Sequence, residues 1–311
     1  MLENKHLISL KDYPSKDIQK IIDTAYHFKT VLQRPIKKVP SLQGITVANL
    51  FFENSTRTKI SFELAQKRLS ADTVNFSASS SSLKKGESFK DTVQNIEAMK
   101  IDAVVMRHPV PGAPVHLTKF IDSIIINAGD GTHEHPTQAI LDMMSLHEKF
   151  GKIKGVKVAI IGDIIHSRVA LSNIYGLMTM GAKVTLCGPS NLIPRQLEEL
   201  GVEINYDLNE VLDWADAVNV LRIQRERMGK SLVPSIREYR KMFGITTERL
   251  SLFKKEFVIM HPGPMNRGVE MDGSVADSDQ AIILDQVLNG VASRMSILYL
   301  LCSGKNSDEE N

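Results

Sequence analysis

The stretch Gly44-Ile45-Thr46-Val47-Ala48-Asn49-Leu50 runs directly into Phe51-Phe52-Glu53-Asn54-Ser55-Thr56-Arg57-Thr58-Lys59-Ile60-Ser61-Phe62-Glu63. The first part is a short apolar run, which predicts a buried strand. From Ile60 onward, apolar residues recur at helical spacing, so we expect residues 55–58 to form the turn between a strand and a helix. Hydroxyl groups, a guanidinium and the free N–H groups of a helix start would suit a phosphate dianion there. Ser and Thr also favour ordinary helix caps, so this stretch alone leaves both interpretations open.

The rest of the chain repeats this alternation. We expect strands at residues 45–51, 72–76, 103–106, 124–127, 156–163, 183–187, 217–220 and 257–260, with helices at 16–32, 60–69, 93–99, 135–150, 169–180, 197–200 and 280–301. Alternating strands and helices are typical of parallel α/β sheets. The predicted fold class is therefore α/β, with two domains that are each a mainly parallel sheet flanked by helices. Ligands of such sheets bind at the carboxyl ends of strands, where both Arg107 and residues 55–58 fall.

A length of 311 residues favours two domains over one. We place the first domain at residues 1–134, a linking helix at 135–150 and the second domain at 151–289, and we expect a C-terminal helix within 290–311 to pack back on the first domain. Residues 77–88 contain too few apolar groups to pack and predict an exposed loop. Residues 228–243 are polar and charged and predict a long loop, and the charged tail from residue 306 is expected to fray.

Composition excludes several classes of function. The net charge of +2 argues against a nucleic-acid partner. No run approaches the length of a membrane span, and the first residues lack the apolar core of a signal peptide, so we expect no membrane association. Cys187 and Cys302 are far apart and in no metal-binding pattern, which indicates a reducing compartment. We therefore expect a cytoplasmic protein.

Common cofactor motifs are missing. Gly162 follows a predicted strand but is not followed by the later glycines of a dinucleotide turn, and the chain has neither a P-loop lysine nor a Gly-x-Ser-x-Gly elbow. A zinc site built from His108, His133, His135 and His261 is disfavoured because no pair has the spacing of a known metal motif. We therefore expect no cofactor and no metal.

Three motifs together resemble the aspartate/ornithine carbamoyltransferase family over essentially the whole chain. They are Phe-x-x-Ser-Thr-Arg-Thr at 52–58, Met-Arg-His-Pro at 106–109 and His-Pro-Thr-Gln at 135–138. Further stretches resemble the aspartate branch of this family: Lys84-Lys85-Gly86-Glu87-Ser88, residues 163–170 and residues 222–227. The ornithine branch would show His-Cys-Leu-Pro where this chain has His261-Pro262-Gly263-Pro264.

The resemblance implies transfer of a carbamoyl group from carbamoyl phosphate to the amine of L-aspartate, an early step of pyrimidine biosynthesis. Ser55, Thr56, Arg57 and Thr58 are suited to the phosphate. Thr58, Arg107 and His135 are candidate donors to the carbonyl oxygen as it becomes negative, and Gln138 with the backbone at 262–263 can hold the carbamoyl NH2. The implied carbamoyl phosphate site is Ser55, Thr56, Arg57, Thr58, Arg107, His135, Gln138, Gly263 and Pro264, and the implied catalytic residues are Arg57, Thr58, Arg107, His135 and Lys85.

L-Aspartate carries two carboxylates, which two guanidinium groups match well. The implied aspartate site is Lys85, Arg168, Arg222 and Gln224. The family pattern also implies a homotrimer in which Ser81 and Lys85 act in the active site of a neighbouring subunit. Arg225, Glu226 and Arg227 are expected to order their loop, and His108, His133, Glu134 and His166 either to have structural roles or to support the residues that contact the substrate.

Two other functions stay open at this point. One is a carbamoyltransferase for ornithine or an acylated ornithine, and the other is a non-catalytic sensor of carbamoyl phosphate. The family often has a second arginine where this chain has Leu171, and some relatives have leucine in place of Gly263. We expect neither departure to remove activity, and we expect the Gly263–Pro264 bond to be cis. Association with regulatory or dihydroorotase-like chains is left open by the sequence.

Overall fold

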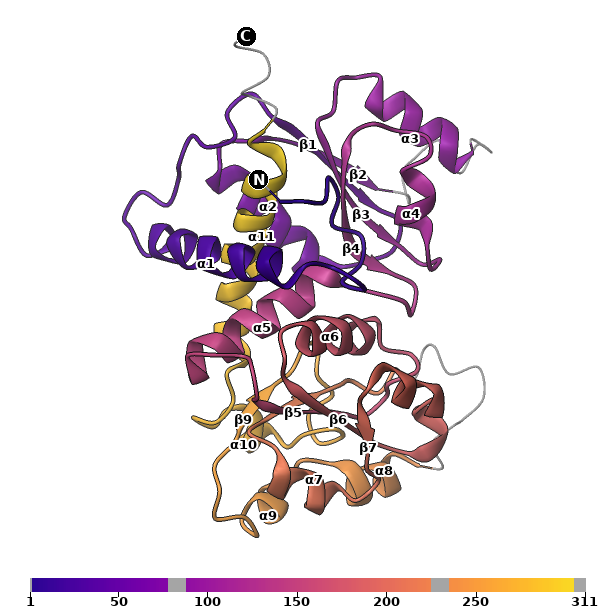
Figure 1. Ribbon diagram of the computed structural model, residues 1–311, viewed down its shortest axis with the longest axis vertical. Helices are drawn as coiled ribbons and strands as arrows, with labels where there is room; N and C mark the ends of the chain where they lie inside the picture. Colours follow the sequence, from indigo (N-terminus) through magenta and orange to yellow (C-terminus); the bar gives the residue numbers. More distant parts are fainter. Residues whose placement is uncertain (1, 78–87, 225–234, 305–311) are drawn as a thin grey trace. The chain divides into compact units, whose positions relative to one another are not determined.

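The structure is a computed structural model that describes residues 2–77, 88–224 and 235–304. The chain divides into two units, one made of Met1–Leu141 with Leu288–Asn311 and the other of Asp142–Val287. Two helices, α5 (Pro136–Phe150) and α11 (Ile283–Cys302), have residues in both units. Each unit has its own parallel sheet (Figure 1).

The sheet of the first unit has four strands in the order β2-β1-β3-β4, all parallel. Its strands are β1 (Thr46–Phe51), β2 (Asp72–Ser77), β3 (Ala103–His108) and β4 (Ile124–Asp130). Its helices, besides the parts of α5 and α11, are α1 (Ser15–Leu32), α2 (Thr56–Arg68), α3 (Phe89–Glu97) and α4 (Ala113–Leu117).

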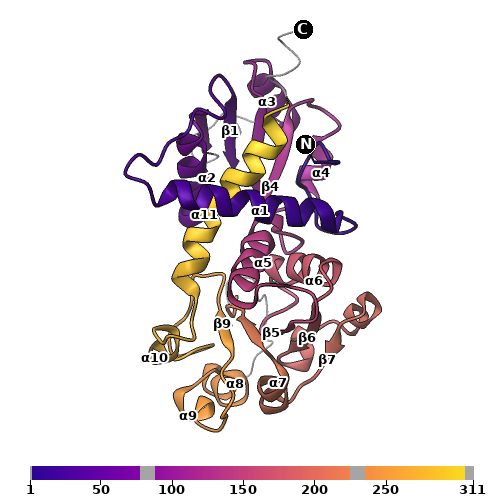
Figure 2. The same ribbon diagram turned by 60° about the vertical axis from the view of Figure 1, so that its left-hand side comes forward.

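Helices cover both faces of this sheet, as Figure 1 shows for α3 and α4 on one side and α2 and α11 on the other. The alternation along β1 explains this, because successive side chains of a strand point to opposite faces. Ala48 and Leu50 join the apolar cluster under α3 and α4, whereas Asn49 hydrogen-bonds Gln66 of α2. Figure 2 shows α1 crossing α11, and Tyr299 of α11 packs edge-on against Phe28 of α1 with 5.6 Å between ring centroids.

The sheet of the second unit has five parallel strands in the order β7-β6-β5-β8-β9. Its strands are β5 (Lys157–Ile161), β6 (Lys183–Cys187), β7 (Glu203–Ile204), β8 (Ala217–Val220) and β9 (Val258–Met260). Its helices are α6 (Arg168–Thr179), α7 (Leu208–Trp214), α8 (Ile236–Phe243), α9 (Thr247–Leu250) and α10 (Gly273–Ala276), with the 3₁₀ turns η3 (Ser190–Leu192) and η4 (Arg195–Leu200).

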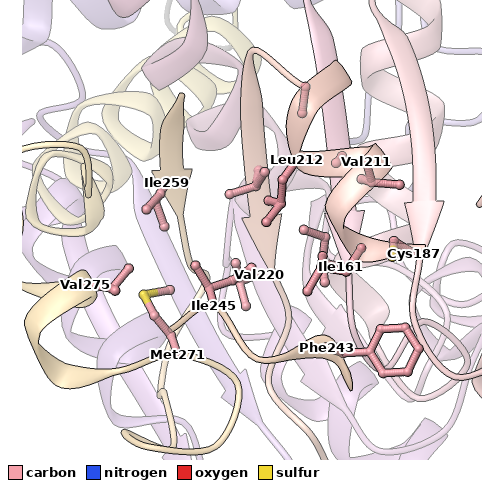
Figure 3. Packing of buried hydrophobic residues seen from close by; sticks show 14 of the residues in the cluster. Ile161, Cys187, Val211, Leu212, Val220, Phe243, Ile245, Ile259, Met271 and Val275 are labelled. Carbon is pink, nitrogen blue, oxygen red and sulfur yellow. The ribbon is translucent and has the colours of Figure 1, made fainter. Parts of the chain in front are cut away.

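One apolar cluster fills the space between this sheet and the helices on one of its faces (Figure 3). Ile161 and Val220 from neighbouring strands meet Val211 and Leu212 of α7 and Phe243 of α8 in this cluster. Because such side chains lose nearly all contact with water, each contributes roughly 1.5–3 kcal/mol. The ends of β5 and β8, which carry predicted site residues, are therefore anchored in a rigid core.

The predicted fold class is confirmed, since each unit is a parallel sheet flanked by helices. The prediction of a long loop over residues 228–243 is wrong for residues 236–243, which form helix α8. Its start has the pattern of a capping box, because the Ser235 hydroxyl accepts a hydrogen bond from the Glu238 N–H. Its buried residues, Tyr239 and Phe243, are four positions apart and so share one face.

The remaining differences are small, and they include four short elements that were not predicted, namely α4, β7, α9 and α10. Helix α3 ends at Glu97 and leaves Met99 exposed, and α11 begins at Ile283 instead of residue 280. Most of the predicted loop at 77–88 lies outside the described part of the chain, as do residues 225–234; of its two ends, Ser77 is the last residue of β2 and Ser88 is the N-cap of α3. None of the helices in the described ranges is long and apolar enough to cross a membrane.

Candidate active site

The turn after β1 forms the start of α2. Ser55 has the extended backbone of an N-cap residue, with φ −157° and ψ 92°, but its hydroxyl makes no capping hydrogen bond. The first turn of α2 contains no acidic residue, and the side chains of Thr56 and Arg57 are exposed. Free N–H groups at an uncompensated positive helix end favour an anion. Of the two interpretations of this turn, the local geometry favours an anion site over an ordinary cap.

Arg107 lies at the end of β3 and contacts the neighbouring strand ends. Its Nη1 donates hydrogen bonds to Thr58 Oγ1 at 3.4 Å and to the Ala128 carbonyl at 3.4 Å. Its Nε donates to Glu53 Oε1 at 2.7 Å, and both side chains of this ion pair are mostly buried. The structure thus brings two predicted site residues, Thr58 and Arg107, together. Glu53 was not predicted as part of this group, because nothing in the sequence marks it as a partner of residue 107.

His135 and Gln138 lie where β4 passes into α5. The side chains of both are buried, with 4% and 9% of their surface exposed. His135 Nδ1 lies 3.4 Å from Thr137 Oγ1. Pro136 occupies the first position of α5, which suits a residue that lacks an N–H. A buried histidine at a helix start is held in a defined orientation, as a donor to a carbonyl oxygen must be.

The turn before His135 is held by Asp130. This carboxylate accepts hydrogen bonds from the Gly112 N–H at 2.7 Å and from Asn127 Nδ2 at 2.9 Å, and it pairs with His133 Nδ1 at 3.1 Å. Burial by itself would raise the pKa of Asp130, but these hydrogen bonds outweigh burial and lower the pKa from its ordinary value. The hydrogen bond with Asp130 raises the pKa of His133. The ion pair therefore stabilises the turn when Asp130 is ionised and His133 is protonated.

This pair predicts a pH dependence of stability. A raised histidine pKa contributes stability that is present below about pH 6.5 and lost as the pH rises, whereas a lowered aspartate pKa contributes stability that is lost only in acid. The difference in unfolding free energy between wild type and His133→Asn should therefore shrink by about 0.5 kcal/mol from pH 6 to pH 8.5. The value is small because the His133 side chain is 37% exposed and solvent screens the pair.

The measurement is urea unfolding of both proteins, followed by circular dichroism at the two pH values. His116→Asn is the matched control, since it replaces an exposed histidine of the same unit. An unfolding difference that stays constant with pH would show that the His133–Asp130 ion pair contributes nothing.

The other polar residues near these strand ends have structural partners. Glu134 is fully buried and accepts hydrogen bonds from the Ser9 hydroxyl and, at 3.0 Å, from the Leu10 N–H. The His108 ring packs against Phe52 and Phe89, with centroids 5.1 Å and 5.4 Å away. Burial lowers the pKa of His108. These contacts agree with the structural roles expected from the sequence.

In the second unit, Arg168 is the first residue of α6. The Ser167 hydroxyl caps this helix by accepting from the Ala170 N–H at 3.3 Å. The Arg168 side chain is only 4% exposed. The guanidinium is a permanent cation in the segment that follows β5, and its planar fork matches a carboxylate in shape.

Arg222 and Gln224 follow the end of β8, the strand that pairs with β5. Both side chains are half-buried. Asp163, which is fully buried after β5, accepts hydrogen bonds from the Gln224 N–H at 3.2 Å and from His166 Nδ1 at 2.8 Å. Asp163 therefore joins the segment before Arg168 to the segment that carries Arg222 and Gln224.

The segment His261-Pro262-Gly263-Pro264 follows the end of β9. The Gly263–Pro264 peptide bond is cis, as expected, and Gly263 has φ +60°, a conformation that favours glycine. The His261 side chain is fully buried, whereas Pro262 and Gly263 are half-buried. Ser81 and Lys85 lie outside the described residues, as do Arg225, Glu226 and Arg227. Within the described ranges, no three His, Cys, Asp or Glu side chains are grouped so that they could hold a metal ion.

Two family models together match nearly the whole chain. Residues 5–148 match the aspartate/ornithine carbamoyltransferase carbamoyl-P binding domain, and residues 154–301 match the Asp/Orn binding domain of the same family. The chain is 61% identical over 298 residues to the aspartate carbamoyltransferase catalytic subunit of Christiangramia forsetii, covering 96% of each chain. It is 60% identical over 304 residues to that of Cytophaga hutchinsonii, covering 98% of this chain and 99% of the relative.

Solved structures agree with this assignment. Aspartate transcarbamoylase from Trypanosoma cruzi in complex with carbamoyl phosphate superposes with a TM-score of 0.88 at 32% identity, covering 96% of each chain. The catalytic subunit of M. jannaschii aspartate transcarbamoylase superposes with a TM-score of 0.86 at 34% identity, covering 97% of this chain and 99% of the other. With both halves of the chain matched and both sheets ending in the expected polar groups, the chain belongs to the aspartate/ornithine carbamoyltransferase family.

Proposed function

We propose that this protein transfers the carbamoyl group of carbamoyl phosphate to the amine of L-aspartate, which yields N-carbamoyl-L-aspartate and phosphate, an early step of pyrimidine biosynthesis. The observation that carries this proposal is the similarity of at least 60% identity, over nearly the full length, to relatives named aspartate carbamoyltransferase catalytic subunit. A related structure from T. cruzi holds both carbamoyl phosphate and aspartate, and it superposes with a TM-score of 0.87.

The donor would be held mainly by the first unit. Its phosphate binds Ser55, Thr56, Arg57 and Thr58, because the start of α2 offers free N–H groups, hydroxyls and a guanidinium and no competing acid. The carbonyl oxygen points at Thr58, Arg107 and His135. The hydrogen bond between Arg107 and Thr58 supports this grouping. The carbamoyl NH2 donates to Gln138 and to the backbone at Pro262, Gly263 and Pro264.

L-Aspartate would be held by Arg168, Arg222 and Gln224 of the second unit, with Lys85 reaching in. Arg168 and Arg222 follow the paired strands β5 and β8, and their segments are joined through Asp163. Two guanidinium groups suit two carboxylates. Ornithine has a single carboxylate and an additional cation, so the same pair of arginines argues against ornithine as the acceptor.

The reaction would proceed by attack of the aspartate nitrogen on the carbamoyl carbon. The C–N bond forms, the bond from carbon to the bridging phosphate oxygen breaks, and the amine proton passes to the departing phosphate. Three donors to the carbonyl oxygen stabilise the negative charge that develops there, and each such donor is typically worth about 3–4 kcal/mol in the transition state. His135 would act as a neutral donor and not as the base, because the cationic Arg57 and Arg107 that are proposed to bind the same substrate disfavour an imidazolium there. Catalysis then comes mainly from positioning and charge stabilisation.

The proposed assembly is a homotrimer in which Ser81 and Lys85 serve a neighbouring active site. Exposed apolar side chains support it: Ile60 and Leu64 on α2, and Val74 on β2, which is an edge strand. Exposed apolar side chains and an edge strand are features that a partner subunit would cover. Sedimentation velocity measures the mass of this assembly. We propose the cytoplasm as its compartment, supported by Cys187 and Cys302, which are not joined in a disulfide.

The direct test is to offer the purified protein carbamoyl phosphate with L-aspartate, L-ornithine or N-acetyl-L-ornithine in parallel reactions. We expect phosphate release with L-aspartate only, at a rate at least about 100-fold above the other amines, because neither ornithine compound offers a second carboxylate to the pair Arg168 and Arg222. Chromatography of N-carbamoyl-L-aspartate confirms the product. Release only with an ornithine would establish the rival transferase, and release with none of the three amines would favour a sensor of carbamoyl phosphate.

A further inference from the structure

His261 lies at the centre of a chain of buried polar contacts in the second unit. Its backbone N–H donates to Gln286 Oε1 at 3.0 Å, and Gln286 Nε2 donates to Asp142 Oδ1 at 2.8 Å. His261, Gln286 and Asp142 are all buried, with at most 3% of their surface exposed. The amide orientation of Gln286 is consistent, because its oxygen meets a donor and its nitrogen meets an acceptor. The backbone of His261 is thereby anchored between α5 and α11.

The imidazole of His261 determines the orientation of the next peptide. Its Nδ1 accepts a hydrogen bond from the Gly263 N–H at 2.8 Å. A ring nitrogen that accepts a hydrogen bond carries no proton, so the neutral ring has its proton on Nε2. Nε2 faces Glu270 Oε1 at 3.5 Å, and both of these side chains are fully buried. The ring is therefore enclosed and cannot rotate away from Gly263 without moving the surrounding residues.

The direction of the Pro262 carbonyl follows from the planarity of the peptide bond. In a trans peptide the C=O of one residue and the N–H of the next lie in one plane and point in opposite directions. The Pro262–Gly263 bond is trans, since the cis bond of this segment is Gly263–Pro264. The Gly263 N–H points at the buried ring, so the Pro262 carbonyl oxygen points away from the ring. His261 Nδ1 thereby holds this oxygen outward as an acceptor.

We propose that His261 is a positioning residue that aims the Pro262 carbonyl at the carbamoyl NH2, and that it thereby selects carbamoyl phosphate over an acyl phosphate of the same shape. This inference rests on the proposed function, because it takes carbamoyl phosphate as the donor. Acetyl phosphate has a methyl group where carbamoyl phosphate has NH2, and a methyl group cannot donate a hydrogen bond. A fixed carbonyl therefore favours the carbamoyl compound, whereas a carbonyl that is free to rotate discriminates less.

The test compares two substitutions of the same branching. Leucine and asparagine have the same number of side-chain heavy atoms and both branch at Cγ, and leucine is the bulkier of the two, so a loss confined to His261→Leu does not come from a larger empty volume. Asparagine Oδ1 can accept from the Gly263 N–H at the former position of Nδ1, and leucine has no acceptor. Calorimetry without any amine measures the dissociation constants of carbamoyl phosphate, acetyl phosphate and inorganic phosphate for each protein.

For His261→Leu we expect the preference for carbamoyl over acetyl phosphate to fall about tenfold, while the affinity for inorganic phosphate changes by less than about twofold. For His261→Asn we expect a preference within about threefold of wild type. An unchanged preference in His261→Leu, or an equal loss in both variants, would overturn the inference. Wild-type protein that binds carbamoyl phosphate with this preference but transfers nothing to aspartate would contradict only the proposed function.

Because His261 is fully buried, its variants can fail to fold. Gln286→Met then provides the second test, since it removes the acceptor of the His261 N–H with little change in volume. The preference for carbamoyl phosphate should fall about threefold in this variant, again with unchanged binding of inorganic phosphate. A preference equal to that of wild type in folded Gln286→Met would count against a positioning role for His261.

Discussion

Arg57→Ala is expected to lower kcat by about 1,000-fold or more while the protein stays folded. In the proposed reaction the leaving phosphate gains charge as its bond to carbon breaks, and Arg57 stands at the helix start that receives this phosphate. Loss of one donor that acts on transition-state charge typically costs 10²- to 10³-fold, and a full cationic charge acts more strongly than a neutral donor. The Arg57 side chain is exposed, so alanine removes little packing.

The control for this prediction is Lys67→Ala, which removes an exposed cation from the last turn of the same helix. It should leave kcat within about twofold. Phosphate release and circular dichroism of both variants separate catalysis from folding. If Arg57→Ala kept kcat within about tenfold of wild type, charge stabilisation by Arg57 would not be part of the mechanism.

The turn that carries Arg57 could be predicted from residues that are adjacent in the sequence. An apolar run followed by hydroxyls and a helical pattern predicted the turn between β1 and α2, and the structure has the helix beginning at Thr56. The turn was predictable because strand, cap and helix signals are adjacent in the chain. Helix α8 carried a comparable local signal in Ser235 and Glu238, but the surrounding charged residues concealed it.

Contacts between distant residues were not predictable in this way. Glu53 pairs with Arg107, 54 positions later, and Asp163 meets the Gln224 N–H, 61 positions later. The hydrophobic pattern predicts which residues are buried, but it does not predict which residue hydrogen-bonds each buried polar group. The roles of the substrate-binding residues therefore stay predictions, whereas the strand ends that carry them are defined by the sheet topology.

Asp142 accepts hydrogen bonds from three residues that are distant in the sequence. We therefore expect Asp142→Ala to lower the free energy of unfolding of the second unit by about 3 kcal/mol or more. Besides Gln286, its carboxylate accepts hydrogen bonds from Asn173 Nδ2 at 2.9 Å and from Asn219 Nδ2 at 3.2 Å, and all four side chains are buried. Alanine would leave three buried amide groups each short of a partner. Each unsatisfied buried donor costs about 1–3 kcal/mol.

The chain has a single tryptophan, Trp214, which lies in α7 of the second unit. Its fluorescence during urea unfolding therefore reports on that unit without a signal from the first. Asp285→Ala is the matched control, because it removes an exposed aspartate from the first turn of α11 in the same unit and should cost less than about 1 kcal/mol. If Asp142→Ala lowered the unfolding free energy no more than the control does, water would have to replace the carboxylate as the acceptor for the three amide groups. In that case the Gln286 side chain would not depend on Asp142 for its orientation, and the anchoring of His261 through Gln286 would lose its support.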